Sequence, residues 1–211
     1  MKYQNQSEYW IRGEFEAMYQ DIDDPWGCHA NSDSLENKIF RSLILENDRQ
    51  SYKKVLDIGC GMGDGTHRLF CSLNKAHVTG IDISATAIEK AVSKYPDLKF
   101  ETKNIMVEQI GTGFDLVILS EVLWYILDDL NGVWMKILSS LQPNGILAIK
   151  QYFPDCQKYG NQIIDGLADF ENFLSSYENN LNVIYSIVIN PKLSGENSGK
   201  ILLAKVQKKC D

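Results

Sequence analysis

The chain has 211 residues, 44% of them hydrophobic and 23% charged, a balance typical of a globular protein with a substantial core. The formal net charge of −7 offers no basic surface for DNA or RNA, so we expect no nucleic-acid partner. No apolar run reaches the ~18 residues of a membrane-spanning helix, and residues 1–10 lack a secretory signal's apolar core, so we expect no membrane partner and a cytoplasmic location.

Residues 1–50 show no strand pattern and are expected to form a helical cap. An aromatic-rich helix is expected over residues 7–19, followed by an acidic turn. A second helix is expected to start near Asp33, with Glu36 completing a capping box. No clean linker follows, so we expect one domain over residues 1–211.

The remainder alternates apolar segments with amphipathic ones, which predicts βα units and a parallel sheet. Strands are expected over residues 53–59, 77–83, 98–102, 114–120 and 146–153, and helices over residues 64–73, 84–95, 126–141 and 162–178. Two late strands, over residues 181–189 and 200–208, are joined too closely for a crossover helix, so we expect an antiparallel hairpin.

A glycine loop follows the first of these strands, with Gly59, Gly61 and Gly63 spaced as GxGxG. A dinucleotide site requires GxGxxG, and this spacing fails that test. Asp82 closes the second strand and can accept hydrogen bonds from both ribose hydroxyls of an adenosine. Asp82 therefore predicts a ligand that contains adenosine, without showing which one, and the glycine spacing argues against a dinucleotide.

The motif "DIGCGMG" resembles the first motif of class I S-adenosylmethionine-dependent methyltransferases, E/D-x-G-x-G-x-G. Three later segments resemble the same family: "GIDIS", "FDLVILSEVLWYI" and "LQPNGILAIK". The resemblance implies a Rossmann-like, doubly wound α/β sheet of seven strands, mostly parallel with a reversed C-terminal hairpin. It implies S-adenosylmethionine as methyl donor, S-adenosylhomocysteine as product, and no metal. It divides the chain after the cap into a cofactor-binding half (51–150) and a C-terminal half (151–211).

The same resemblance implies the cofactor-binding residues. They are Asp57, Gly59, Cys60, Gly61, Gly63, Asp82, Ile83, Asn104, Ile105, Ser120 and Trp26. Asp57 would order the loop or meet the cofactor ammonium, and Ile83 would lie against the adenine. Asn104 departs from the family's usual Asp, although its amide oxygen can still accept from the adenine amine.

The cap and the segment after the fourth strand resemble a narrower family, the nodulation methyltransferases. The similar stretches are "FEAMYQDIDDPWGC", "SLENK" and "LSEVLWYI". Members N-methylate the deacetylated amino sugar of chitooligosaccharide signals, which implies a small-molecule or saccharide acceptor. The chain departs near His29 and Leu35, where that family tends to carry Arg and Tyr, and the acceptor stays open.

An amine must lose its proton before it attacks a methyl group, which calls for a carboxylate near the acceptor. Glu121 directly follows the fourth strand, where ligands of open α/β sheets bind, and is the expected catalytic acid–base residue. Tyr125 is the expected hydrogen-bonding partner four residues later. The alternatives are a helix-capping role for Glu121 and simple packing for Tyr125.

Cap residues have further possible roles. Trp10 and Trp26 would form an aromatic lid or anchor the acidic turn. Asp23 and Asp24 would line an acidic mouth or be solvated, and His29 would serve as a base or stay outside the site.

Other functions stay open at this point. An O-methyltransferase would use Lys150 as base, and a catalytically silent cofactor-binding subunit would use no base. "SEVL" stands after the fourth strand where nucleic-acid methyltransferases carry an N/D-P-P-Y-type motif, which argues against that class. The scattered cysteines, without CxxC spacing, predict no zinc site or disulfide framework. We expect a monomer or homodimer.

Overall fold

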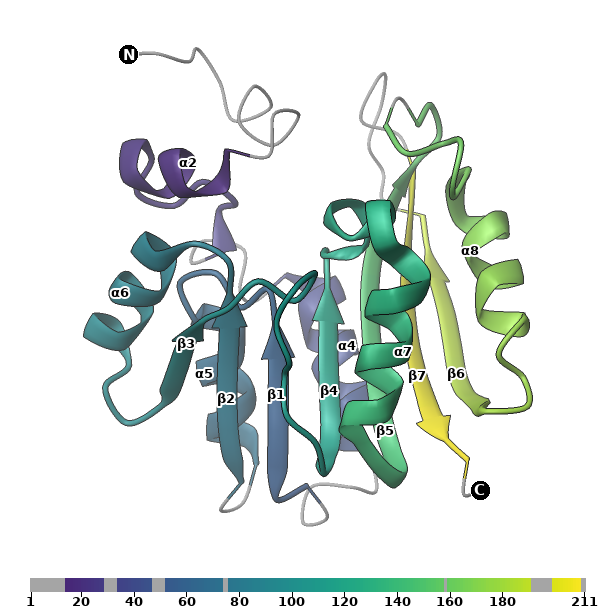
Figure 1. The fold of residues 1–211 in the computed structure, drawn as a ribbon, viewed down its shortest axis with the longest axis horizontal. Helices are drawn as coiled ribbons and strands as arrows, with labels where there is room; N and C mark the ends of the chain where they lie inside the picture. The colour runs from purple at the N-terminus through teal and green to yellow at the C-terminus, as the bar shows by residue number, and fades with distance from the viewer. Residues whose placement is uncertain are drawn as a thin grey trace.

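The computed structural model describes residues 14–28, 34–46, 52–73, 76–157, 159–190 and 199–209. Seven strands form one sheet in the order β3-β2-β1-β4-β5-β7-β6 (Figure 1). They are β1 (Lys54–Ile58), β2 (His77–Asp82), β3 (Lys99–Thr102), β4 (Phe114–Ser120), β5 (Leu141–Pro154), β6 (Leu181–Ile189) and β7 (Gly199–Lys208).

The pairing of these strands confirms the predicted fold class. Strands β1 to β5 pair in parallel, whereas β7 runs antiparallel to both β5 and β6. The helices are α2 (Phe15–Asp21), α4 (Leu35–Leu45), α5 (Asp64–Ser72), α6 (Ala85–Lys94), α7 (Leu130–Ser140) and α8 (Gly166–Ser175). Among the described residues, no helix is long and apolar enough to cross a bilayer.

Strand β4 shows why helices cover both faces of the sheet. Its four central residues are all buried, and successive side chains of a strand point to opposite faces. Leu116 and Ile118 join a cluster with α4, α5 and α6, while Val117 and Leu119 join another with α7 and α8. Figure 1 shows α7 and α8 in front of the sheet and α4 and α5 behind it. A continuous apolar run therefore indicates a strand that is covered by helices on both faces of the sheet.

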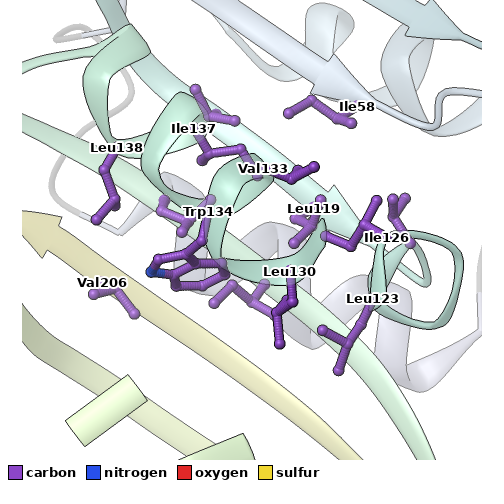
Figure 2. Close-up of a cluster of buried hydrophobic side chains, with 14 of the residues drawn as sticks. Ile58, Leu119, Leu123, Ile126, Leu130, Val133, Trp134, Ile137, Leu138 and Val206 are labelled. Atoms are coloured by element: carbon purple, nitrogen blue, oxygen red, sulfur yellow. The ribbon is translucent and has the colours of Figure 1, made fainter. Parts of the chain in front are cut away.

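Helix α7 carries the largest fully buried side chain, Trp134. Figure 2 shows Leu130, Val133 and Trp134 together on the face of α7 that packs on the sheet, with Val206 of β7 beyond them. The Trp134 ring also meets Phe173 of α8 edge-on at 5.1 Å between centroids. This packing holds α7 and α8 together against the sheet.

That segment differs from the expected helix over residues 126–141. Helix α7 begins only at Leu130, after two short 3-10 turns, η1 (Leu123–Tyr125) and η2 (Leu127–Asp129). The Asp129 carboxylate accepts the backbone N–H of Gly132 at 3.2 Å and so caps the helix at this point. A helix-period apolar pattern does not reveal that such a side chain ends the helix early.

The start of α4 differs from the prediction in one respect. Helix α4 starts near Asp33 as expected, but its N-cap is Ser34, whose hydroxyl accepts the N–H of Asn37 at 3.3 Å. Glu36 is therefore a first-turn acid, and the predicted capping box is wrong. The first helix is described from Phe15, so most of its expected start lies outside the described residues.

The observed bounds of the other helices and strands differ from the expected ones by a few residues. Helix α8 is shorter than expected at both ends, and β5 starts directly after α7 at Leu141. The carboxyl ends of the parallel strands β1, β2 and β4 all lie on one side of the sheet, which we call its carboxyl edge. Figure 1 shows the cap helix α2 above α6 on that same side. This edge carries the glycine loop, Asp82 and Glu121.

Candidate functional site

The glycine loop lies between β1 and α5 and is shaped by backbone conformation. Gly61 and Gly63 have φ of +53° and +80°, in the left-handed region that favours glycine. A Cβ on Gly61 would lie 2.8 Å from the Tyr19 hydroxyl, and one on Gly63 would lie 2.6 Å from the Phe100 ring. These glycines are therefore required by close approach as well as by conformation.

Asp82, at the end of β2, holds this loop. Its carboxylate accepts the N–H of Gly61 and that of Ser84, each at 2.9 Å. Burial raises the pKa of Asp82, and these backbone donors oppose that rise. Each carboxylate oxygen has a second lone pair, so Asp82 keeps acceptor capacity for the two hydroxyls of a ribose.

Asp57, at the end of β1, is turned into the protein. Its carboxylate accepts a hydrogen bond from the Thr66 hydroxyl of α5 at 2.6 Å, and the residue is 7% exposed. Burial raises the pKa of Asp57 to about 6 although the Thr66 hydrogen bond lowers it. This hydrogen bond ties the end of β1 to α5.

The residues expected beside an adenine differ in their surroundings. Ile83 is 51% exposed and presents apolar surface next to Asp82. Asn104 uses its amide oxygen to accept the N–H of Met106 at 2.9 Å, which shapes the turn after β3. Ile105 is buried in the core cluster, so its side chain supports that turn from below.

Glu121 has an unusual backbone conformation at the end of β4. Its φ is +59°, which costs a non-glycine residue on the order of 1 kcal/mol. Its Oε2 accepts the N–H of Tyr152 at 3.0 Å and the amide of Gln151 at 3.3 Å, while Oε1 lies 3.9 Å from the Lys150 ammonium. Surrounding protein raises the pKa of the Glu121 carboxyl, and the 41% exposure of its side chain limits that effect.

Tyr125 lies in η1, close to Glu121 and under the cap. Its ring meets Phe15 of α2 edge-on at 4.7 Å between centroids, and the Trp26 ring lies 6.4 Å away. Burial first, and then the negative charge of Glu121, raise the pKa of Tyr125 above its ordinary value. Helix α2 and its following turn thus bring aromatic rings to the edge that carries Glu121.

Glu16 and Lys90 dock α2 on α6. The Glu16 carboxylate accepts hydrogen bonds from the Ser84 hydroxyl at 2.7 Å and from the N–H and hydroxyl of Thr86 at 3.2 and 2.5 Å. Lys90 donates to the Tyr19 carbonyl at 2.7 Å. Sequence reasoning missed Glu16 and Tyr19, because no local spacing marks a contact between residues some 70 positions apart.

The other expected site residues fall in several places. Cys60 is half-buried in the loop, where its sulfur faces Gly80 of β2, and Ser120 is half-buried at the end of β4. Lys150 donates to the Asn37 side chain at 2.8 Å. Asp24 accepts the N–H of Cys28 at 2.9 Å within the acidic turn. Trp10 and His29 lie outside the described residues.

The described part of the chain contains no group of three or more His, Cys, Asp or Glu side chains placed to hold a metal ion. What the edge does contain is a loop whose glycines hold left-handed conformations, a buried carboxylate with spare acceptor capacity, and a half-exposed carboxylate beside aromatic rings. The arrangement can hold an adenosine-bearing ligand on one side and a cationic group on the other.

Comparisons with known proteins concern both the sequence and the fold. A family model described as "Methyltransferase domain" matches residues 49–186. Among solved structures, N-methyltransferase NodS from Bradyrhizobium japonicum WM9, in complex with S-adenosyl-L-homocysteine, aligns with a TM-score of 0.69 at 20% identity, covering 97% of this chain and 99% of that one. At this identity the match shows the fold, and it agrees with the narrower resemblance predicted above.

Two curated relatives match a shorter segment. Trans-aconitate 2-methyltransferase from Rhodopseudomonas palustris (strain BisB18) is 30% identical over 110 residues, which are 52% of this chain and 43% of that protein. Malonyl-[acyl-carrier protein] O-methyltransferase from Acetivibrio thermocellus is 30% identical over 123 residues, or 56% and 43%. The matched segment spans less than half the length of these relatives.

Proposed function

This chain belongs to the methyltransferase domain family, and we propose that it transfers a methyl group from S-adenosylmethionine to the amine of a small molecule or saccharide. The family match confirms the predicted class, an S-adenosylmethionine-dependent methyltransferase. The acceptor and the roles of single residues are the proposal. The observation that carries it is the Glu121 carboxylate, held half-exposed at the end of β4.

The glycine-loop side fits S-adenosylmethionine. A methionine moiety would lie against the backbone of this loop, where Gly61 and Gly63 hold left-handed conformations. Asp82 has acceptor capacity for the ribose hydroxyls, and Ile83 has exposed apolar surface for the adenine. When bound, the cofactor supplies an activated methyl group, so the protein needs to align the acceptor, remove its proton and exclude water.

Glu121 would orient the acceptor and remove its proton. An aliphatic amine is mostly protonated near neutral pH, and its ammonium is a good hydrogen-bond donor to Oε1. The raised pKa of Glu121 brings this carboxylate closer to the pKa of an effective general base. Tyr125, Phe15 and Trp26 would close the apolar side of the acceptor site and keep water from the methyl group.

An oxygen acceptor is the second candidate, and Lys150 is the observation that favours it. Its ammonium lies at the same edge, 3.9 Å from Glu121, and the two curated relatives named above include an O-methyltransferase. However, a carboxylate acceptor would have to approach the like charge of Glu121, which is unfavourable in a partly desolvated site. The amine is therefore the better match to this edge.

The experiment has two steps. Thermal unfolding with S-adenosylmethionine, S-adenosylhomocysteine and NAD tests the cofactor, since a ligand at 100 times its Kd stabilises the fold by about 2.7 kcal/mol. Release of S-adenosylhomocysteine is then measured with D-glucosamine, its β-1,4-linked oligomers and trans-aconitate. Turnover with the amines that is lost in Glu121→Gln supports the proposal.

Three results would contradict it. Turnover with trans-aconitate alone would indicate that the acceptor atom is oxygen and not an amine nitrogen. Cofactor binding without turnover on any acceptor would favour a silent cofactor-binding subunit, and stabilisation by NAD alone would overturn the cofactor.

A further inference from the structure

Three consecutive residues of β5 surround Glu121. The Lys150 carbonyl accepts the Glu121 N–H at 2.8 Å, and its ammonium lies 3.9 Å from Oε1. The Tyr152 N–H and the Gln151 amide both donate to Oε2. The strained backbone of Glu121 is therefore held from the neighbouring strand at both its main chain and its side chain.

Gln151 links this carboxylate to the turn that carries Tyr125. It is 1% exposed, its Nε2 donates to Glu121 Oε2 at 3.3 Å, and its Oε1 accepts the N–H of Leu123 at 3.1 Å. Leu123 opens η1, the turn in which Tyr125 lies. One buried amide thus sets the position of the carboxylate relative to the aromatic wall.

We infer that Gln151 is a positioning residue for methyl transfer, which holds Glu121 Oε2 so that Oε1 is the oxygen that meets the acceptor amine. This inference rests on the proposed function of Glu121. Gln151 acts through Glu121, since its own side chain is buried behind the carboxylate. A Gln suits this place because its amide nitrogen donates to a carboxylate while its amide oxygen accepts from a backbone N–H.

Ionisable groups from three parts of the chain face Glu121. Lys150 on β5 favours its charged form. Tyr125 in η1, Tyr152 on β5 and Cys28 in the acidic turn each interact electrostatically with it. Among the described residues, these tyrosine and cysteine groups are neutral near pH 7, so they add no charge beside Glu121.

The test replaces Gln151 by Glu. Gln151→Glu keeps an oxygen for the Leu123 N–H, removes the donor to Glu121 and puts a like charge beside it. Gln142→Glu is the matched control, because Gln142 also lies on β5 and also donates to a carboxylate, that of Asp115, at the opposite edge of the sheet. Gln151→Asn is a milder second variant that keeps the amide but shortens its reach.

Kinetics with D-glucosamine and its oligomers provide the main readout. We expect Gln151→Glu and Gln151→Asn to lower kcat for the amine roughly tenfold to hundredfold with an unchanged affinity for S-adenosylmethionine. In Gln151→Glu, the acidic limb of the pH profile should move to higher pH. Gln142→Glu should change neither quantity. Wild-type kcat and pH profile in folded Gln151→Asn would overturn the inference.

A second readout separates this inference from the proposed function. The Glu121 carboxyl is titrated by carbon NMR in protein saturated with S-adenosylhomocysteine, with Glu121→Gln identifying its resonance. If no amine is methylated but the Glu121 titration moves in Gln151→Asn and not in Gln142→Glu, the proposed function fails and the contact between Gln151 and Glu121 stands. An unmoved titration contradicts the positioning role itself.

Discussion

The two sides of the candidate site differ in the groups that form them: backbone groups on one side and side chains on the other. The proposed cofactor side is mainly backbone: glycines in left-handed conformations, and N–H groups that bind the Asp82 carboxylate. The acceptor side is mainly side chain: Glu121 is held by residues of β5, and Tyr125 packs on rings of the cap. Backbone requirements leave a short sequence motif, whereas the acceptor side is assembled from three separate segments.

This difference explains why the class of cofactor is readable from the sequence and the acceptor is not. A loop whose backbone must lie close to a ligand needs glycines at set positions, because they carry no Cβ. A carboxylate that must face an amine can be supported by many different neighbours. The cofactor side should therefore respond to single substitutions by losing binding, and the acceptor side by losing turnover.

The largest expected effect is on the cofactor side, at Asp82. Asp82→Ala should weaken S-adenosylmethionine binding about 100-fold or more, because it removes the ribose acceptor and releases the loop. Asp115→Ala is the control, since Asp115 also accepts two backbone N–H groups, at 2.7 Å, but at the opposite edge. Titration calorimetry compares them, and equal weakening in both variants would reduce Asp82 to a general structural role.

Glu121→Gln should act almost entirely on turnover. We expect kcat to fall about 100-fold, as for the loss of a general base, while the affinity for S-adenosylmethionine stays within about twofold of the wild type. Glu101→Gln, at the same edge on β3, should leave kcat unchanged. A large loss of cofactor affinity in Glu121→Gln would erase the proposed division between the two sides.

Asp57 should make the glycine-loop side sensitive to pH. Its pKa is raised to about 6, so the folded chain binds this proton more tightly than the unfolded chain does. The free energy of unfolding should thus gain from Asp57 as the pH falls through 6, and lose about 1–3 kcal/mol of that contribution above it. Urea unfolding of wild type and Asp57→Asn at pH 5 and pH 8 measures this difference, which Asp57→Asn should remove.

A companion variant sharpens the Asp57 measurement. Thr66→Val removes the hydrogen bond that opposes the rise in the pKa of Asp57. It should therefore enlarge the stability difference between pH 5 and pH 8. A smaller difference in Thr66→Val than in wild type would show that another group dominates this pH dependence.

The smallest effect is expected where the cap joins the two sides. Glu16→Gln weakens the docking of α2 on α6, and we expect S-adenosylmethionine affinity and kcat to fall together by about threefold. Glu36→Gln, a first-turn acid of α4, serves as the control. An effect on kcat alone would assign α2 to the acceptor side only.

Much of the fold could be predicted from the sequence, because short, largely apolar segments alternate with amphipathic ones and β4 has four successive buried apolar residues. The start of α7 could not, since the Asp129 side chain caps it inside a segment with helical periodicity. The capping box was assigned wrongly for a similar reason: Ser34 and Asp33 are both good N-cap residues, and only backbone geometry distinguishes them.

The candidate site likewise has residues that the sequence pattern identifies and residues that only tertiary contacts identify. The glycines and Asp82 could be named because their spacing reflects a local backbone requirement. Glu16 and Gln151 could not, because each acts through a residue far away in the sequence: Glu16 through Thr86, and Gln151 through Glu121. Gln151 lies in a buried strand where its sequence context predicts only a sheet residue.

By itself the sequence determined the order of strands and helices along the chain and the glycine loop with its paired acid, while the class of methyl donor came from the resemblance of its motifs to class I methyltransferases. These depend on residue periodicity and on backbone conformations that few residue types accept. The tertiary structure alone decided that Glu121 is held in a left-handed conformation by β5, and that α2 lies over the same edge. Those features arise from contacts between distant segments, which form only when the sheet closes and the cap docks.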